Sequence, residues 1–88
     1  MTKDKISVPD TRLNARTRRL FLNHLAETAN VAASARAAGI ASSNVYAERR
    51  RSAGFRDDWA RALGEGYARL ETDLLGEALL AATGKTAE

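Results

Sequence analysis

The chain has no cysteine and only one proline among its 88 residues. Without cysteine it can form neither disulfide bonds nor a thiolate metal site, so nothing in the sequence indicates secretion. The segment from Met1 to Pro9 is charged and lacks the apolar core of a signal peptide. No apolar run approaches the ~20 residues that a membrane-spanning helix needs. We therefore expect a cytoplasmic protein that makes no contact with a membrane.

The sequence also lacks the alternation of apolar and polar residues that is typical of strands. Its apolar residues recur every three or four positions instead, which predicts an all-α fold. A first helix is expected to begin near Asp10, Thr11 or Asn14, each of which can cap it. Two short helices are expected next, from Val31 to Ala38 and from about Ser43 to Arg51.

Small and polar residues mark the ends of these short helices. Asn30 is suited to cap the second helix, and Gly39 is suited to end it in a positive-φ conformation. Ser42 and Ser43 are both good caps for the third helix. The segment from Ser52 to Gly54 is expected to break the chain before the next element.

A long amphipathic helix of roughly 25 residues is expected from Phe55 onward, although each of its three glycines weakens it by about 1 kcal/mol relative to alanine. Its first large apolar residues, Phe55, Trp59, Leu63 and Tyr67, are expected to pack within the domain. A chain this short has little core to offer, so the second half of the helix is expected to contact another subunit. The residues predicted for this oligomerisation are Leu70, Leu74, Leu75, Ala78 and Leu79.

Charge is unevenly distributed within the net charge of +3. Residues 1–51 hold ten Lys or Arg against four Asp or Glu, whereas residues 52–88 hold four against seven. A polyanion-binding module followed by a separate interaction segment would show this asymmetry, although an unevenly charged, solvated surface would show it as well. The first helix begins with a cluster of arginines, which opposes the helix dipole and so favours a polyanion partner. These arginines are Arg12, Arg16, Arg18 and Arg19.

The segment from Val31 to Arg50 has the spacing of a helix-turn-helix. Gly39 follows Ala35 by four residues, and Val45 follows Gly39 by six. The small side chain lets two helices cross closely, the glycine turns the chain, and the valine anchors the second helix from behind. Ile40 would then fill the turn.

An exposed face of short polar residues followed by arginines is expected on that second helix, and such a face suits the major groove of DNA. The spacing also fits an ordinary helical hairpin, and the three consecutive arginines at its end also complement the helix dipole. The predicted DNA-binding residues, including those of the first helix, are Arg16, Arg18, Arg19, Ser42, Ser43, Asn44, Tyr46, Ala47, Arg49, Arg50 and Arg51. The expected organisation is a flexible arm (1–10), a helix-turn-helix domain (11–54), the long helix (55–83) and a flexible tail (84–88).

The run from residue 21 to residue 63 resembles the N-terminal domain of small terminase subunits from tailed bacteriophages and phage-like gene transfer agents. Family members carry phrases such as "LAETGNV", "AARAAGVS", "STVY" and "DPxFAxxWxxAL". The matching residues here are Leu25, Ala26, Glu27, Thr28, Asn30, Val31, Ala37, Ala38, Gly39, Ile40, Ser43, Asn44, Val45, Tyr46, Phe55, Trp59, Ala62 and Leu63.

This resemblance implies recognition of double-stranded viral or element DNA for packaging in a bacterial host cell. It also implies assembly into a ring and delivery of DNA to a large terminase subunit that carries the ATPase and nuclease. Glu48 departs from the family, which often has an aromatic or apolar residue there, so its carboxylate must be exposed or paired with an arginine. Ser52 and Gly54 also depart, because they stand where the family has an acid and a proline.

Other classes of protein remain open on the sequence alone. An enzyme is not expected, because the single histidine, His24, has no matching nucleophile or metal-ligand set and suits a partly buried packing role. No cofactor or metal is expected, and Asp73 and Glu77, four residues apart, suit a solvated helix face. Two alternatives are a transcriptional or recombination regulator with the same helix-turn-helix, and a helical scaffold that does not bind DNA.

Overall fold

The structure, a computed structural model, describes residues 12–83. These residues form four α-helices and no strand: α1 (Ala15–Thr28), α2 (Val31–Ala38), α3 (Ser42–Arg51) and α4 (Ala53–Thr83). The prediction of an all-α fold is therefore confirmed. The arm expected over 1–10 and the tail expected over 84–88 lie outside the described residues. Within residues 12–83 no helix is both long enough and apolar enough to span a bilayer.

Helix α1 begins after Asn14, one of the three caps predicted for it. The Asn14 Oδ1 atom accepts a hydrogen bond from the Thr17 backbone N–H at 2.8 Å. The helix ends at Thr28, and Ala29 follows in the left-handed region with a φ of 56°. Ala29 is the one non-glycine residue of the described chain with a positive φ, so the end of α1 carries a conformation that alanine disfavours.

Helix α2 begins and ends as its sequence predicts. The Asn30 Oδ1 atom accepts from the Ala33 N–H at 2.9 Å, and Gly39 closes the helix with a φ of 74°. The Ile40 N–H then donates to the Ala35 carbonyl at 2.9 Å, which turns the chain toward α3. The predicted positive φ of Gly39 is therefore confirmed.

The prediction that Ser42 or Ser43 caps α3 is wrong. Ala41 occupies the cap position and makes no side-chain hydrogen bond. Its carbonyl accepts from the Asn44 and Val45 N–H groups at 3.0 and 3.3 Å, so the helix has already begun at Ser42. Because the helix starts one residue earlier than expected, both serines lie in its first turn, where their hydroxyls are exposed.

Helix α4 begins two residues before the predicted Phe55, and the break ahead of it is shorter than expected. Ser52 alone leaves the helical conformation, with φ −122° and ψ 114°. Its hydroxyl accepts from the Phe55 N–H at 3.1 Å, which caps α4. Ala53 and Gly54, predicted to belong to the break, are therefore already helical. The helix then continues without interruption through Gly64, Gly66 and Gly76 to Thr83.

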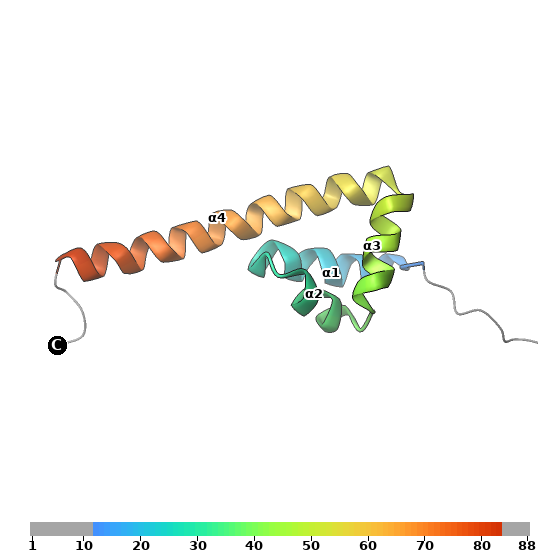
Figure 1. Ribbon diagram of the computed structural model, residues 1–88, viewed down its shortest axis with the longest axis horizontal. Helices are drawn as coiled ribbons and strands as arrows, with labels where there is room; N and C mark the ends of the chain where they lie inside the picture. The colour runs from blue at the N-terminus through green and yellow to red at the C-terminus, as the bar shows by residue number, and fades with distance from the viewer. Residues whose placement is uncertain (1–11, 84–88) are drawn as a thin grey trace, which may run out of the picture.

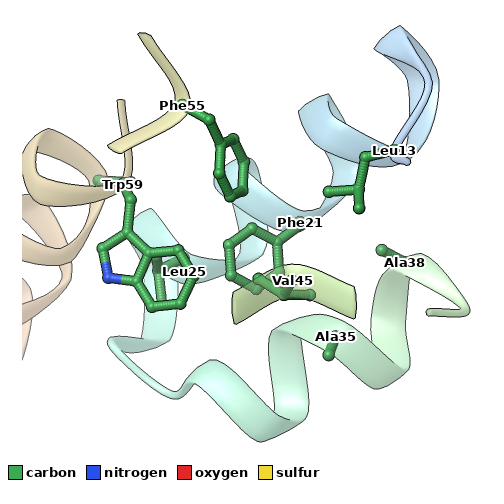
Figure 2. Packing of buried hydrophobic residues seen from close by; sticks show 9 residues of the cluster. Leu13, Phe21, Leu25, Ala35, Ala38, Val45, Phe55 and Trp59 are labelled. Carbon is green, nitrogen blue, oxygen red and sulfur yellow. The ribbon is translucent and has the colours of Figure 1, made fainter. Parts of the chain in front are cut away.

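The core lies where α1 packs against the other helices. Figure 2 shows the rings of Phe21, Phe55 and Trp59 turned toward one another, with Val45 of α3 beside Phe21. The Phe21 ring centroid lies 5.8 Å from that of Phe55 and 5.3 Å from that of Trp59. Phe21, Phe55 and Val45 are fully buried, and Ala35 is 1% exposed. The expected core roles of Phe55, Trp59, Ala35 and Val45 are thus confirmed.

Helix α4 runs beside α1 and then extends well past its end (Figure 1). The two helices lie very close together at Gly66, where an added Cβ would lie 2.6 Å from the Leu25 carbonyl oxygen and from the Ala29 nitrogen. Gly66 therefore permits the crossing, whereas the sequence suggested only that it weakens the helix.

Every residue from Tyr67 to Thr83 is exposed. The prediction that Tyr67 packs within the domain is wrong, because its side chain is 58% exposed. The reason is that Gly66 is the residue that faces α1, so Tyr67, about 100° further round the helix, points away from it. Helix α1 still reaches the next turn of α4, where Arg69 Nε donates to the Ala26 carbonyl at 3.1 Å. Leu63, by contrast, packs against the core as expected. The predicted oligomerisation residues Leu70, Leu74, Leu75, Ala78 and Leu79 all lie in the exposed segment.

Candidate nucleic-acid interface

Helix α3 has one buried side and one exposed side. Val45 and Glu48, three residues apart, point inward, and they are 0% and 5% exposed. Asn44 and Ala47, which the sequence placed on the outward face, are half-buried at its edges. The exposed residues of the helix are Ser42, Ser43, Tyr46, Arg49, Arg50 and Arg51.

Glu48 is paired with two arginines, which is one of the two outcomes that the sequence left open. Its Oε2 atom accepts a hydrogen bond from an Arg18 guanidinium nitrogen, and its Oε1 atom accepts from Arg51 Nη2 at 2.7 Å. The Arg18 Cζ atom also lies 5.4 Å from the centroid of the Phe55 ring. The Arg18 side chain therefore joins α1 to the carboxylate of α3 and to a ring of α4.

Arg18 and Arg51, both predicted to bind DNA, are thus committed in part to the fold. Their side chains retain 36% and 35% exposure, and the Arg18 Nε atom is buried without a hydrogen-bond acceptor in the described chain. A guanidinium that already donates to a buried carboxylate has fewer donors to offer a phosphate. The two arginines can add positive potential at the surface, but they are less available for direct contacts.

The other arginines of α3 remain open to solvent. The Arg49 Cζ atom lies 5.1 Å from the Trp59 ring centroid, and the Tyr46 ring lies 5.4 Å from the same ring. Within residues 12–83, Arg50 forms no hydrogen bond or ion pair. Arg49 and Arg50 therefore present positive charge that no carboxylate of this segment neutralises.

Arg56 belongs to the same surface, although the sequence prediction did not include it. Its Nη1 atom donates to the Arg49 carbonyl at 2.8 Å, which links the first turn of α4 to the last turn of α3. The one signal for it in the sequence was its place just after the Ser52 break, where a new helix must leave close to the end of α3. Arg56 lies in the half of the chain that carries net negative charge, and the net charge of a segment does not show where a single arginine lies in the fold.

The first-helix arginines are divided by the fold. Arg18 reaches α3 through Glu48, but Arg16 and Arg19 are exposed and form no hydrogen bond or ion pair with α3 in the part of the chain described. The predicted site is therefore not one continuous bonded cluster. It consists of the exposed surface of α3, of Arg18, which binds Glu48 on the buried side of α3, and of Arg16 and Arg19, which are exposed separately on α1.

His24 has a structural environment. It is half-buried, with Nδ1 3.0 Å from the Ser34 hydroxyl, and that hydroxyl donates to the Asn30 carbonyl at 2.7 Å. Because the Ser34 proton is used in this way, Ser34 Oγ is left to accept from Nδ1–H. His24 therefore joins α1 to α2, in agreement with its predicted packing role. Among residues 12–83 no group of three or more His, Asp or Glu side chains is arranged to hold a metal ion, and Asp73 and Glu77 are exposed.

Comparison of the chain with protein-family models, with curated proteins and with solved structures found no significant match. The role of this surface must therefore be inferred from its own geometry and charge.

Proposed function

We propose that this protein binds double-stranded DNA through α2 and α3, which act as a helix-turn-helix with α3 as the recognition helix. One observation carries the proposal. The buried Val45 and Glu48 orient α3 so that its outward side offers hydroxyls, a tyrosine and arginines, with no exposed acid among them. Short polar side chains permit close approach to a groove, and arginines bind phosphates or guanine.

The turn between the two helices supports this interpretation. Gly39 adopts the left-handed conformation between the two helices, and Ala35, the small residue of α2, is buried. In helix-turn-helix proteins the first helix crosses the DNA backbone while residues near the start of the second reach the bases. Asn44, in the first turn of α3, is accordingly our candidate for reading adenine, while Arg49 and Arg50 are candidates for binding the DNA backbone.

We further propose that the biological role is that of a small terminase subunit, which recognises viral or element DNA in a bacterial host cell and passes it to a large terminase subunit. The family resemblance of residues 21–63 supports this role, and so does the exposed leucine-rich half of α4, which suits a homo-oligomer. A ring of such chains would hold several DNA-binding surfaces side by side and raise avidity. In this proposal the chain itself performs no catalysis and needs no cofactor.

The exposed leucines also favour a second candidate, a helical scaffold that binds protein only. The two candidates differ in their response to salt. Binding that neutralises phosphates weakens steeply as salt rises, and the log-log slope becomes shallower by about one unit for each phosphate that is no longer neutralised. The test is to measure duplex affinity over a range of salt concentrations for the wild type, Arg50→Gln and Asn44→Ala.

Arg50→Gln should weaken binding to every duplex and reduce the salt slope by about one unit. Asn44→Ala should change sequence preference more than non-specific affinity. Arg61→Gln is the matched control, because Arg61 is an exposed arginine of α4 that pairs with Asp58 at 3.0 Å. Absence of salt-dependent duplex binding by the wild type would favour the scaffold, and protection of one specific operator by a dimer would favour a regulator.

A further inference from the structure

A hollow of about 300 Å³ lies at the corner where α3 ends and α4 begins. Its lining consists of Tyr46, Arg49, Arg50 and Arg56, and we refer to it as the corner hollow. It is separate from the first turn of α3, which the proposed function assigns to base recognition. It contains one residue, Arg56, that the DNA-binding prediction did not include.

The walls of the corner hollow are held in place by the core. The Arg49 guanidinium lies over the Trp59 ring, with Cζ 5.1 Å from the centroid, and the centroids of the Tyr46 and Trp59 rings are 5.4 Å apart. Trp59 is only 5% exposed and packs on Phe21. Arg56 is fixed from the other side by its hydrogen bond to the Arg49 carbonyl. Side chains positioned in this way lose little entropy when a ligand arrives.

The charge of the corner hollow is uncompensated. Three guanidinium groups line it, and none of them forms an ion pair within residues 12–83. Glu48, the single acid of α3, is already paired with Arg18 and Arg51. Asp58 of α4 pairs with Arg61 and lines a different hollow. Asp57 adjoins Arg56 in the chain, but it is exposed and pairs with none of the three. Like charges gathered in this way repel one another unless an anion binds between them.

We propose that the corner hollow binds a phosphodiester group. Guanidinium groups match the tetrahedral phosphate with paired N–H donors, and the Tyr46 hydroxyl can add another donor. The volume is about ten times the roughly 30 Å³ that one water occupies in the liquid, so the hollow has room for a phosphate. The assignment rests on the proposed DNA-binding function and deepens it. The corner hollow would fix the position of the DNA backbone while the first turn of α3 reads the bases.

The protein provides its own probe, because Trp59 is the single tryptophan of the chain and lies against Arg49. Trp59 emission is followed while the wild type is titrated with a short oligothymidylate, which carries phosphodiesters without a duplex, and with polyglutamate as a non-phosphate polyanion. Duplex affinity and its salt slope are measured separately with a labelled duplex. Both sets of measurements are repeated with Arg56→Gln and Arg61→Gln after their melting curves have been compared with the wild type.

The expected result is a saturable change in Trp59 emission with oligothymidylate. Arg56→Gln should abolish that change and reduce the duplex salt slope by about one unit, whereas Arg61→Gln should behave as the wild type does. If Arg56→Gln fails to fold, Arg50→Gln replaces it, because Arg50 also lines the hollow and makes no bond that holds residues 12–83 together.

The other outcomes separate the two proposals. Duplex binding that is unaffected by Arg56→Gln, with no response of Trp59 emission, would overturn the corner hollow and leave the proposed function standing. A response to oligothymidylate without any duplex binding would support the corner hollow and overturn the proposed function. An equal response to polyglutamate would show a general polyanion surface, which contradicts a phosphodiester site.

Discussion

Arg18 of α1 and Glu48 of α3, which are 30 residues apart in the chain, form a part-buried ion pair beside the Phe55 ring of α4. Arg51 donates to the other oxygen of the same carboxylate. Each carboxylate oxygen therefore has a charged donor, which is the condition under which a buried carboxylate is tolerated. The carboxylate thus joins α3 to α1, and its partner Arg18 in turn lies over a ring of α4.

We expect Glu48→Ala to destabilise the domain by roughly 1–3 kcal/mol, because it leaves the part-buried Arg18 guanidinium without its acceptor. Glu48→Gln should cost less, since its amide oxygen can still accept one hydrogen bond. Thermal melts followed by circular dichroism measure both. Glu71→Ala, at an exposed position of α4, is the control and should have little effect.

A double variant tests whether the ion pair is replaceable. Arg18→Met with Glu48→Leu should be markedly more stable than Glu48→Ala, because apolar side chains of similar volume often substitute for a buried pair. Melting temperatures of Glu48→Ala and wild type that coincide would show that the carboxylate has no part in orienting the helices.

Gly66→Ala should destabilise the domain by more than ~1 kcal/mol, against the helix propensity that favours alanine. The added Cβ would lie 2.6 Å from backbone atoms of α1, which cannot move aside as a side chain could. Gly64→Ala and Gly76→Ala are matched controls on the same helix, because a Cβ at either position meets nothing within 4 Å. Both should raise the melting temperature, and a similar rise in Gly66→Ala would mean that α4 does not approach α1 so closely.

Ala29→Gly should stabilise the domain by about 1 kcal/mol, because Ala29 holds a left-handed φ of 56° that glycine adopts without strain. Gly39→Val is the converse case, since its φ of 74° resists a β-branched side chain, and it should cost more than ~1 kcal/mol. Chemical denaturation of both variants measures the two changes. Their signs should be opposite, and a loss of stability in Ala29→Gly would contradict the left-handed end of α1.

Replacing Leu74 and Leu75 with glutamate should yield a folded but smaller species with weaker DNA binding. The two leucines are 64% and 60% exposed, so charge there does not disturb the core, but it would disrupt an apolar contact between subunits. Native mass measurement at micromolar concentration, alone and with duplex, reports the outcome. Gly64→Glu is the control, because Gly64 precedes the leucine-rich exposed segment and a Cβ there meets nothing within 4 Å. A wild type that stays monomeric, or a double variant that keeps its full assembly, would show that these leucines do not form a contact between subunits.

The sequence by itself determined the helices, most of their ends and the turn. Asn14, Asn30 and Gly39 form hydrogen bonds with backbone groups three or four residues away, so these helix ends are encoded locally. The apolar residues Phe55 and Trp59 of α4, four positions apart, and Val45 of α3 mark the buried sides of their helices. Only the tertiary structure decided which arginines are free. Arg18 is engaged by a carboxylate 30 residues away, while Arg56 joins Arg49 across a helix boundary. Likewise, Gly66 lies against the backbone of α1 while Tyr67 beside it points to solvent. Which side of a long helix meets its neighbour is a property of packing, which no local pattern encodes.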